Sequence, residues 1–244
     1  MSISIEGKTA LVTGANRGIG KAIVERFLDG GAKKVYLAVR NPETTTELTE
    51  KYGDKVITLE LDVAKAQSVG AAAKAIQELD ILVNNAGVLA PADPLSDHVE
   101  DSLKQELEVN TFGLVRVAKA FTPHLEKSKG ALVQMNSVVS LRTFPHVSTY
   151  SASKAASYAI TQALRETLQE RGVQVLSVHP GPIKTDMAKQ AGLEDGESPC
   201  AVAEEIVGAL KNGDFHLFPD AMSQTFEAAY QSFSDSVITA DLSE

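Results

Sequence analysis

Short apolar runs recur along the chain, and stretches with helical patterning separate them. The runs are rich in valine, leucine and isoleucine and are bounded by turn-forming residues. They are TALVT (9–13), VYLAV (35–39), VITLEL (56–61), DILVNN (80–85), ALVQMN (131–136), VQVLSVHP (173–180) and FHLF (215–218). Strands that alternate with helices and are apolar throughout belong to parallel sheets that are buried on both faces. The expected fold is therefore α/β, a doubly wound parallel seven-stranded sheet with helices on both faces.

The length of the chain favours one domain. Its 244 residues suffice for a large α/β domain, and no linker, internal repeat or low-complexity tract divides them. A single domain over 1–244 is expected. The loosest stretch is KQAGLEDGESP, which is polar and contains glycine. We expect residues 186–200 to form a mobile loop over a site, with an ordinary surface loop as the alternative.

Composition and charge exclude several classes of protein. Apolar residues make up 43% of the chain, but no apolar run approaches the ~18 residues of a membrane span. The N-terminal MSISIEGKTALVTGA is typical of a first strand and not of a signal peptide, so a cytoplasmic protein is expected. The net charge of −9 disfavours nucleic-acid binding. The only cysteine is Cys200, and no Cys/His cluster has metal-ligand spacing, so no metal site is expected.

A glycine cluster follows the first apolar run and precedes the amphipathic stretch KAIVERFLDGG. Glycines let the backbone turn sharply and approach a pyrophosphate, whose charge is favoured by the free N–H groups at a helix start. The spacing G-x3-G-x-G differs from the commoner G-x-G-x-x-G, so an ordinary turn is the alternative. The pattern indicates a Rossmann-type dinucleotide site. Its expected loop residues are Gly14, Asn16, Arg17, Gly18, Ile19 and Gly20.

The end of the second apolar run indicates which dinucleotide is bound. Many such sites place an acidic residue there to bind the ribose 2′-hydroxyl. This chain has Val39 followed by Arg40, and Arg17 lies in the glycine loop. Charge-assisted hydrogen bonds to a 2′-phosphate contribute roughly 1.5–3 kcal/mol each before screening. NADP(H) is therefore predicted over NAD(H), by about 10- to 1000-fold. The alternative is that Arg40 is only a solvated charge.

The stretch YSASK (150–154) places a tyrosine and a lysine four residues apart. On a helix, Tyr150 and Lys154 would share one face, one turn apart. A free tyrosine has a pKa near ~10. An ammonium group about 4 Å away, at an effective dielectric constant near 20, favours the phenolate by roughly 4 kcal/mol before desolvation opposes it. We therefore expect Lys154 to lower the pKa of Tyr150. The alternative is a small-residue helix that packs closely on a neighbour.

Six motifs occur in a fixed order along the chain: TGANRGIG (13–20), NNAG (84–87), Asn110 in LEVNTFG, Ser137, YSASK and PGPIKT (180–185). In order and spacing they resemble the short-chain dehydrogenase/reductase family, across nearly the whole chain up to Thr185. The resemblance implies an oxidoreductase that transfers hydride between NADP(H) and a ketone, an aldehyde or a secondary alcohol. The implied catalytic group is Asn110, Ser137, Tyr150 and Lys154.

The resemblance also implies roles for these residues. Tyr150 would protonate the carbonyl oxygen, Ser137 would donate a second hydrogen bond to it, and Asn110 would hold a water at a local helix kink. An exposed asparagine is the alternative for Asn110. The implied cofactor contacts are Asp62 and Val63 near the adenine, Asn84, Ala86 and Gly87 under the adenosine ribose, Pro180, Gly181, Ile183 and Thr185 around the nicotinamide and phosphates, and Tyr150 and Lys154 at the nicotinamide ribose.

The expected substrate pocket has walls after the strands that end near Gly87 and Ser137, and beyond Met187. Its expected residues are Leu89, Phe144, His146 and Met187. This mostly apolar wall suits an uncharged ketone or aldehyde. No lysine lies six or seven residues after Tyr150, which favours carbonyl reduction over C=C reduction.

Two other functions stay open from the sequence. A 3-oxoacyl-(acyl-carrier-protein) reductase would use Lys127, Lys129 and Arg171 to bind the acidic carrier. A catalytically silent NADP(H)-sensing regulator would keep the fold without the chemistry. The family resemblance also implies a homo-oligomer, a tetramer or a dimer, which would form through the long helices expected at about 99–127 and 149–171.

Overall fold

Seven parallel strands form one sheet in the order β3-β2-β1-β4-β5-β6-β7. The structure is a computed structural model that describes residues 2–193 and 195–240. The strands are β1 (Thr9–Thr13), β2 (Lys34–Val39), β3 (Val56–Glu60), β4 (Ile81–Asn84), β5 (Ala131–Met135), β6 (Gln174–Val178) and β7 (His216–Leu217). The predicted doubly wound sheet is confirmed.

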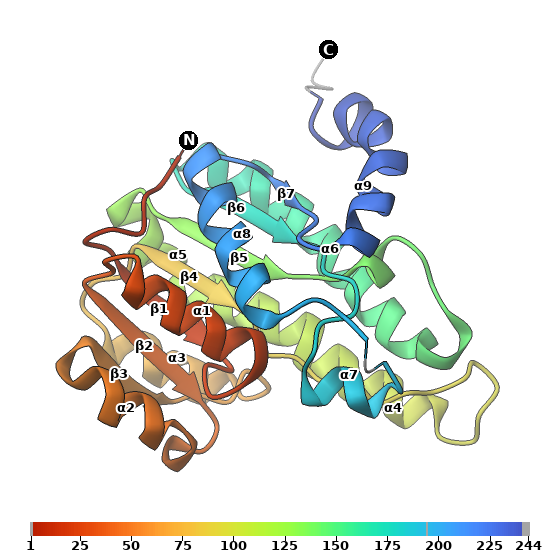
Figure 1. The fold of residues 1–244 in the computed structure, drawn as a ribbon, viewed down its shortest axis with the longest axis horizontal. Coiled ribbons are helices and arrows are strands. Elements are labelled where there is room, and N and C mark those ends of the chain that lie inside the picture. The colour runs from red at the N-terminus through yellow and green to blue at the C-terminus, as the bar shows by residue number, and fades with distance from the viewer. Residues whose placement is uncertain (1, 194, 241–244) are drawn as a thin grey trace.

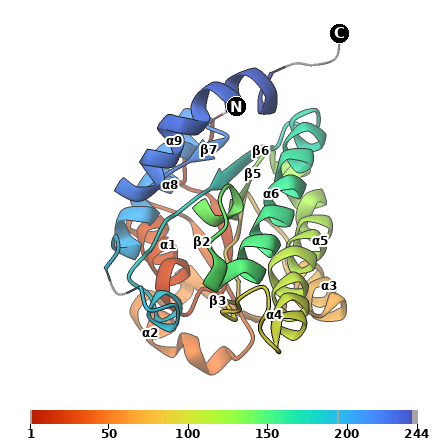
Figure 2. The same ribbon diagram turned by 90° about the vertical axis from the view of Figure 1, so that its right-hand side faces the viewer.

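Helices cover both faces of the sheet (Figures 1 and 2). They are α1 (Gly18–Asp29), α2 (Thr46–Tyr52), α3 (Ala66–Ala75), α4 (Val99–Glu106), α5 (Gly113–Ser128), α6 (Ser148–Gln169), α7 (Asp186–Gln190), α8 (Pro199–Asn212) and α9 (Ala221–Phe233). Helices α1 and α8 pack together on one face. Figure 2 shows α3, α5 and α6 on the other face.

Each face of the sheet has its own apolar core. On the α1 and α8 face, Phe27 and Ile206 are fully buried against the strands. On the other face, Phe121 of α5 and Leu132 of β5 are fully buried. Burying a side chain of this size stabilises the fold by about 1.5–3 kcal/mol. The two cores hold the carboxyl ends of the strands at fixed positions, which is where the predicted motifs lie.

The edge strands differ from the expectation that every strand is buried on both faces. Strand β3 lies at the edge of the sheet and exposes 38% of Ile57. The run FHLF predicted a four-residue strand, but β7 is only His216–Leu217. Short edges of this kind offer few unpaired backbone groups to another sheet.

The sheet changes its direction of growth at β1, which pairs with β2 on one side and with β4 on the other. In open α/β sheets, ligands bind at the carboxyl ends of the strands beside such a switch point. The glycine loop follows β1 and the NNAG motif follows β4. The topology therefore brings both motifs to one crevice.

The segment 186–200 begins as the short helix α7 and then pairs by one β-bridge, Ile183 with Glu197. Thr185 caps α7 by accepting a hydrogen bond from the Ala188 amide at 3.3 Å. The mobility expected for this segment stays a prediction.

No helix within 2–193 or 195–240 is both long enough and apolar enough to cross a membrane. The cytoplasmic location also stays a prediction.

Candidate active site

The glycine loop between β1 and α1 disfavours any residue other than glycine at three positions. Gly14 and Gly18 have φ values of +66° and +54°, in the left-handed region that favours glycine. A Cβ atom on Gly20 would lie 2.2 Å from the Gly14 carbonyl oxygen. These positions form a bare backbone cradle at the start of α1, which fits a dinucleotide pyrophosphate.

Thr13 and Asn85 hold the glycine loop against the NNAG segment. The Thr13 hydroxyl oxygen accepts hydrogen bonds from the backbone amides of Asn85 and Ala86, each at 2.9 Å. The Asn85 side-chain amide donates to the Thr13 carbonyl oxygen at 2.9 Å. Both residues belong to the motifs recognised in the sequence, but no role was predicted for either. The cradle and the floor beside it are thus built as one unit.

The predicted phosphate-binding arginines lie at the ends of neighbouring strands and are accessible. Arg17 is 67% exposed, and its guanidinium group lies 3.6 Å from the Asp186 carboxylate. Arg40 is exposed at the end of β2 and forms no ion pair with any residue that the structure describes. Asp62 follows β3 and accepts a hydrogen bond from the Ala64 amide at 3.0 Å. Both guanidinium groups are accessible to a phosphate, which at Arg17 would compete with Asp186.

Asn110 lies in a π-helix, Leu107–Phe112, that joins α4 to α5. A departure from α-helical hydrogen bonding is therefore present where the sequence predicted a kink. The Asn110 side chain is 2% exposed, so the alternative of an exposed asparagine is wrong. Its amide oxygen accepts from the Val88 amide at 2.9 Å, and its amide nitrogen donates to the Val88 carbonyl oxygen at 3.0 Å and to Ser153 Oγ at 2.9 Å. Asn110 thus fixes the backbone just after the NNAG motif.

Lys154 and Asn110 lie beside Gly87, and Lys154 also lies beside Tyr150. A Cβ atom on Gly87 would lie 3.2 Å from Asn110 Oδ1 and 3.8 Å from Lys154 Nζ. Lys154 Nζ donates to the Met135 carbonyl oxygen at 2.7 Å and lies 5.6 Å from the centre of the Tyr150 ring. The predicted shared face of α6 is confirmed, and a bare Gly87 backbone lines it.

The pKa shifts of the pair differ from the prediction. Burial raises the pKa of the Tyr150 phenol above its ordinary value, and the negative charge of Glu106 raises it further. Burial lowers the pKa of Lys154 to about 8. The expected fall in the pKa of Tyr150 is therefore wrong for the surroundings that this chain provides. Desolvation outweighs the attraction of an ammonium group that is itself buried and bonded to a carbonyl.

Ser137 follows β5 and is 8% exposed. Its hydroxyl group donates to the Pro180 carbonyl oxygen at 3.2 Å and accepts from the Val139 amide at 3.4 Å. The short 3-10 helix Val138–Ser140 that follows packs against α6, the helix of Tyr150 and Lys154. The structure thus joins Ser137 to the PGPIKT segment and places it beside the helix of the other predicted catalytic residues.

The PGPIKT segment closes the predicted cofactor site from the other side. Thr185 Cγ2 lies 3.2 Å from the position of a Cβ atom on Gly18, so this segment contacts the glycine loop. The Gly181 amide donates to the Asp220 carboxylate at 2.7 Å. Asp220 was not predicted, because it lies far along the chain at the start of α9. Ile183 is buried, and the predicted contact of its backbone with the carboxamide stays a prediction.

The predicted substrate wall is partly exposed. Leu89, Phe144 and Met187 are half-buried and His146 is exposed. The Arg142 guanidinium group lies 5.2 Å from the centre of the Phe144 ring. Their assignment to a pocket stays a prediction.

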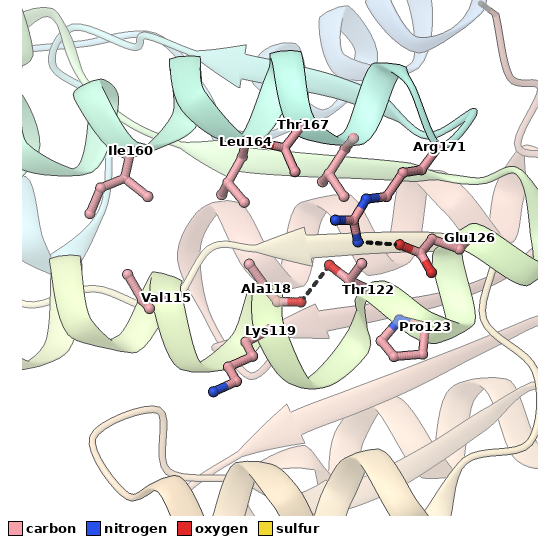
Figure 3. Close-up of a pocket in the computed structure, with 11 residues that line it drawn as sticks. Val115, Ala118, Lys119, Thr122, Pro123, Glu126, Ile160, Leu164, Thr167 and Arg171 are labelled. Carbon is pink, nitrogen blue, oxygen red and sulfur yellow. Dashed lines mark hydrogen bonds and ion pairs between the residues drawn. The ribbon is translucent and has the colours of Figure 1, made fainter.

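A groove of about 350 Å³ lies elsewhere, between α5 and α6 (Figure 3). Val115, Ala118, Ile160 and Leu164 are among its lining residues. Arg171 and Glu126 also line it, and they form an ion pair at 2.7 Å. The groove lies on the two long helices named for oligomer formation, and that assembly stays a prediction.

Comparison with known proteins gives consistent relatives. A sequence model of the short chain dehydrogenase family matches residues 8–196. An NADPH-dependent 3-dehydrocapnine reductase of Ornithobacterium rhinotracheale is 38% identical over 75% of this chain and 69% of its own. A 3-oxoacyl-(acyl-carrier-protein) reductase of Vibrio cholerae is 35% identical over 85% of this chain and 86% of its own.

Solved structures extend the likeness to the whole fold. The crystal structure of a short chain dehydrogenase from Burkholderia cenocepacia, in complex with NADP, has a TM-score of 0.88 to this chain. The two are 31% identical, and the match covers 98% of this chain and 100% of the other.

Proposed function

Because the chain belongs to the short-chain dehydrogenase family, we propose that it is an NADP(H)-dependent oxidoreductase that reduces a ketone or an aldehyde, or oxidises the corresponding secondary or primary alcohol. The observation that carries this proposal is that Lys154 lies beside both the Tyr150 ring and the Gly87 backbone, which Asn110 also approaches. This cluster follows β4, beside the cradle of Gly14 and Gly20. The bound dinucleotide would supply or accept the hydride.

The choice of NADP(H) rests on charge. Arg17 is exposed in the glycine loop, and Arg40 is exposed at the end of β2, where an acidic residue would otherwise select NAD(H). The similar structure from Burkholderia cenocepacia contains NADP, and the similar reductase of Ornithobacterium rhinotracheale is NADPH-dependent by name. Both support the same cofactor for this chain.

Tyr150 is the proposed proton donor in reduction. Its raised pKa keeps the phenol neutral at physiological pH, and only the neutral form can donate a proton to the carbonyl oxygen. The Ser137 hydroxyl donates a second hydrogen bond to that oxygen as negative charge develops. Lys154, with a pKa of about 8, can release or take up a proton near neutral pH. It is the proposed route by which Tyr150 regains its proton.

A second candidate is reduction of a 3-oxoacyl group carried by an acyl carrier protein. The 35% identity to the Vibrio cholerae reductase favours it. Arg171, one of the residues named for carrier binding, is paired with Glu126 at 2.7 Å, and the Lys129 ammonium group donates to the Arg171 carbonyl oxygen at 3.0 Å. The ion pair with Glu126 offsets the charge that Arg171 could present to an acidic carrier. The sensor alternative lacks support, because all four residues of the catalytic group are present.

The first test substitutes the phenol. Tyr150→Phe should lower kcat for carbonyl-dependent NADPH oxidation by about 10²- to 10⁴-fold, since it removes the proton donor. The measurement is a panel of ketones, aldehydes and carrier-bound 3-oxoacyl groups, with the NADPH Kd determined in parallel and expected within about threefold of the original value.

Tyr158→Phe is the matched control. Tyr158 lies on the same helix, two turns further on, and bonds to His216 and Tyr230 outside the proposed site. Its kcat should stay within about threefold of the original value. Full activity in Tyr150→Phe would contradict the mechanism. If the wild-type protein binds NADPH but no carbonyl compound in the panel causes it to oxidise the cofactor, the sensor function would be favoured instead.

A further inference from the structure

The segment after the NNAG motif is held at every second residue by the helices beside it. Asn110 bonds to both the amide and the carbonyl oxygen of Val88. Glu106 Oε1 accepts from the Ala90 amide at 2.7 Å. The Ala92 carbonyl oxygen accepts from the Ser148 hydroxyl at 2.9 Å and from the Ser148 amide at 3.3 Å. We call residues 88–92 the wall segment. Its position is set by three side chains from two neighbouring helical regions.

Glu106 is the unusual member of this set. It ends α4, four residues before Asn110, and it is 0% exposed. Its second oxygen, Oε2, is buried, and the nearby hydroxyl group is that of Thr149, which precedes Tyr150 in the chain. Burial raises the pKa of Glu106, and the hydrogen bonds from the Ala90 amide and the Thr149 side chain oppose that rise.

A buried carboxyl destabilises a fold, and a leucine or methionine would fill this space at lower cost. The shortest contact that Glu106 makes in return, to the Ala90 amide at 2.7 Å, fixes the backbone of the wall segment. The wall segment includes Leu89, whose side chain is assigned to the substrate pocket. The carboxyl group of Glu106 therefore contributes to the shape of the predicted substrate pocket more than to the stability of the core.

We propose that Glu106 is a positioning residue that determines which carbonyl compounds the site accepts, because it fixes Ala90 and with it the wall segment beside Tyr150. This inference rests on the proposed function. Glu106 does not contact the reacting atoms. Without its Oε1 atom, the Ala90 amide has no acceptor and the middle of the wall segment is free to move. A looser wall binds a substrate in more orientations, fewer of which place the carbonyl at Tyr150.

The test compares two substitutions at one position. In Glu106→Ala the acceptor is lost, and the Ala90 amide is left without its buried partner. We expect KM for the preferred carbonyl compound to rise about tenfold, and discrimination between compounds of different size to fall by a similar factor. In Glu106→Gln the amide oxygen can still accept from Ala90, so both quantities should stay within about threefold. Glu100→Ala, at an exposed carboxylate on the same helix, is the control.

Amide hydrogen exchange reports on the wall segment without any reaction. The Ala90 amide should exchange about tenfold faster in Glu106→Ala and at the original rate in Glu106→Gln and Glu100→Ala. If Glu106→Ala does not fold, Glu106→Met, which lacks an acceptor and has a similar volume, replaces it.

Two results would overturn the proposal. One is unchanged exchange at Ala90 in Glu106→Ala. The other is a lower Tm with unchanged KM and unchanged discrimination, which would make Glu106 a structural residue only. If the wild-type protein reduces no carbonyl compound, the proposed function fails. In that case the exchange measurement still decides whether Glu106 holds the wall segment.

Discussion

Tyr150 and Lys154 show how burial acts on two ionisable groups of opposite charge. Burial favours the uncharged form of each, so it raises the pKa of the phenol and lowers that of the ammonium group. The result is a neutral Tyr150 beside a lysine with a pKa of about 8. A proton can therefore leave or reach Lys154 near neutral pH with little free-energy change, while Tyr150 keeps its proton until a carbonyl oxygen accepts it.

Arg40 provides a test of cofactor choice at the residue scale. Arg40→Ala should raise the NADPH Kd about tenfold, because it removes one charge-assisted contact at an exposed site. The NADH Kd should stay within about twofold, since NADH lacks the 2′-phosphate. Fluorescence titration measures both. Lys33→Ala, just before the amino end of β2, is a control at the opposite end of that strand. An equal change in both dissociation constants would refute a role at the 2′-phosphate.

Two local elements place the functional groups, and both depart from regular geometry. The π-helix Leu107–Phe112 aims the Asn110 side chain at the wall segment and leaves the Asn110 carbonyl oxygen to accept from Ser157 Oγ at 2.8 Å. π-Helical turns inside α-helices are often found at functional sites. The glycine loop is the second element, and its shape depends on the absence of side chains where α1 meets β1 and the NNAG segment.

Gly20→Ala tests the glycine loop as an element. The added Cβ atom would lie 2.2 Å from the Gly14 carbonyl oxygen, so the loop or α1 must shift. We expect the free energy of unfolding to fall by about 1–3 kcal/mol and NADPH binding to weaken at least tenfold. Urea unfolding and fluorescence titration measure the two effects.

Gly208→Ala is the matched control for that substitution. Gly208 lies inside α8, and a Cβ atom there would meet nothing within 4 Å. Alanine should therefore raise the free energy of unfolding by about 0.5–1 kcal/mol through helix propensity. Unchanged stability and cofactor binding in Gly20→Ala would show that the loop adapts to a side chain.

At the scale of the whole molecule, a buried polar cluster joins the last strands to the helices beside them. His179 follows β6 and bonds to Ser177 Oγ at 2.7 Å. His216 of β7 bonds to the Tyr158 hydroxyl at 2.7 Å, and that hydroxyl also lies 3.1 Å from the Tyr230 hydroxyl of α9. Burial lowers the pKa of His179 to about 3 and that of His216 to about 4. The packing of β6 and β7 against the helices beside them therefore requires His179 and His216 to be uncharged.

Acid should unfold the protein through this cluster. The folded-state pKa values lie below the ordinary histidine value of about 6.5, so the unfolded chain binds these protons first. Stability from the two groups is complete above about pH 6.5 and is lost as the pH falls toward 4. Urea unfolding between pH 7 and 4.5 should show this slope, and His179→Gln should reduce it. His98→Gln, at an exposed histidine, is the control. An unchanged slope in His179→Gln would remove His179 as its source.

The sequence predicted features that depend on local pattern. Continuous apolar runs marked the strands of a parallel sheet, and an asparagine inside a helical stretch marked the kink at Asn110. Glu106 was missed because VEDSLKQELEVN (99–110) gives it the same local setting as the exposed Glu100 and the half-buried Glu108. Its burial comes from the packing of α4 on α6 and on the wall segment, which no local pattern records. The sequence predicted the wrong direction for the pKa shift of Tyr150, because the sequence does not show how deeply the phenol is buried.

The ion pair between Arg17 and Asp186 joins the glycine loop to the first residue of α7, which lies far along the chain. Both side chains are about two thirds exposed, at 67% and 65%, and such pairs contribute about 0–1 kcal/mol. A 2′-phosphate and the Asp186 carboxylate would therefore compete for one guanidinium group, and the phosphate would win at little cost. We expect cofactor binding to release the first residue of α7 from the glycine loop. Cofactor binding at the glycine loop would then affect the start of the segment 186–200, because Asp186 would lose its ion pair with Arg17. The fold itself would not change.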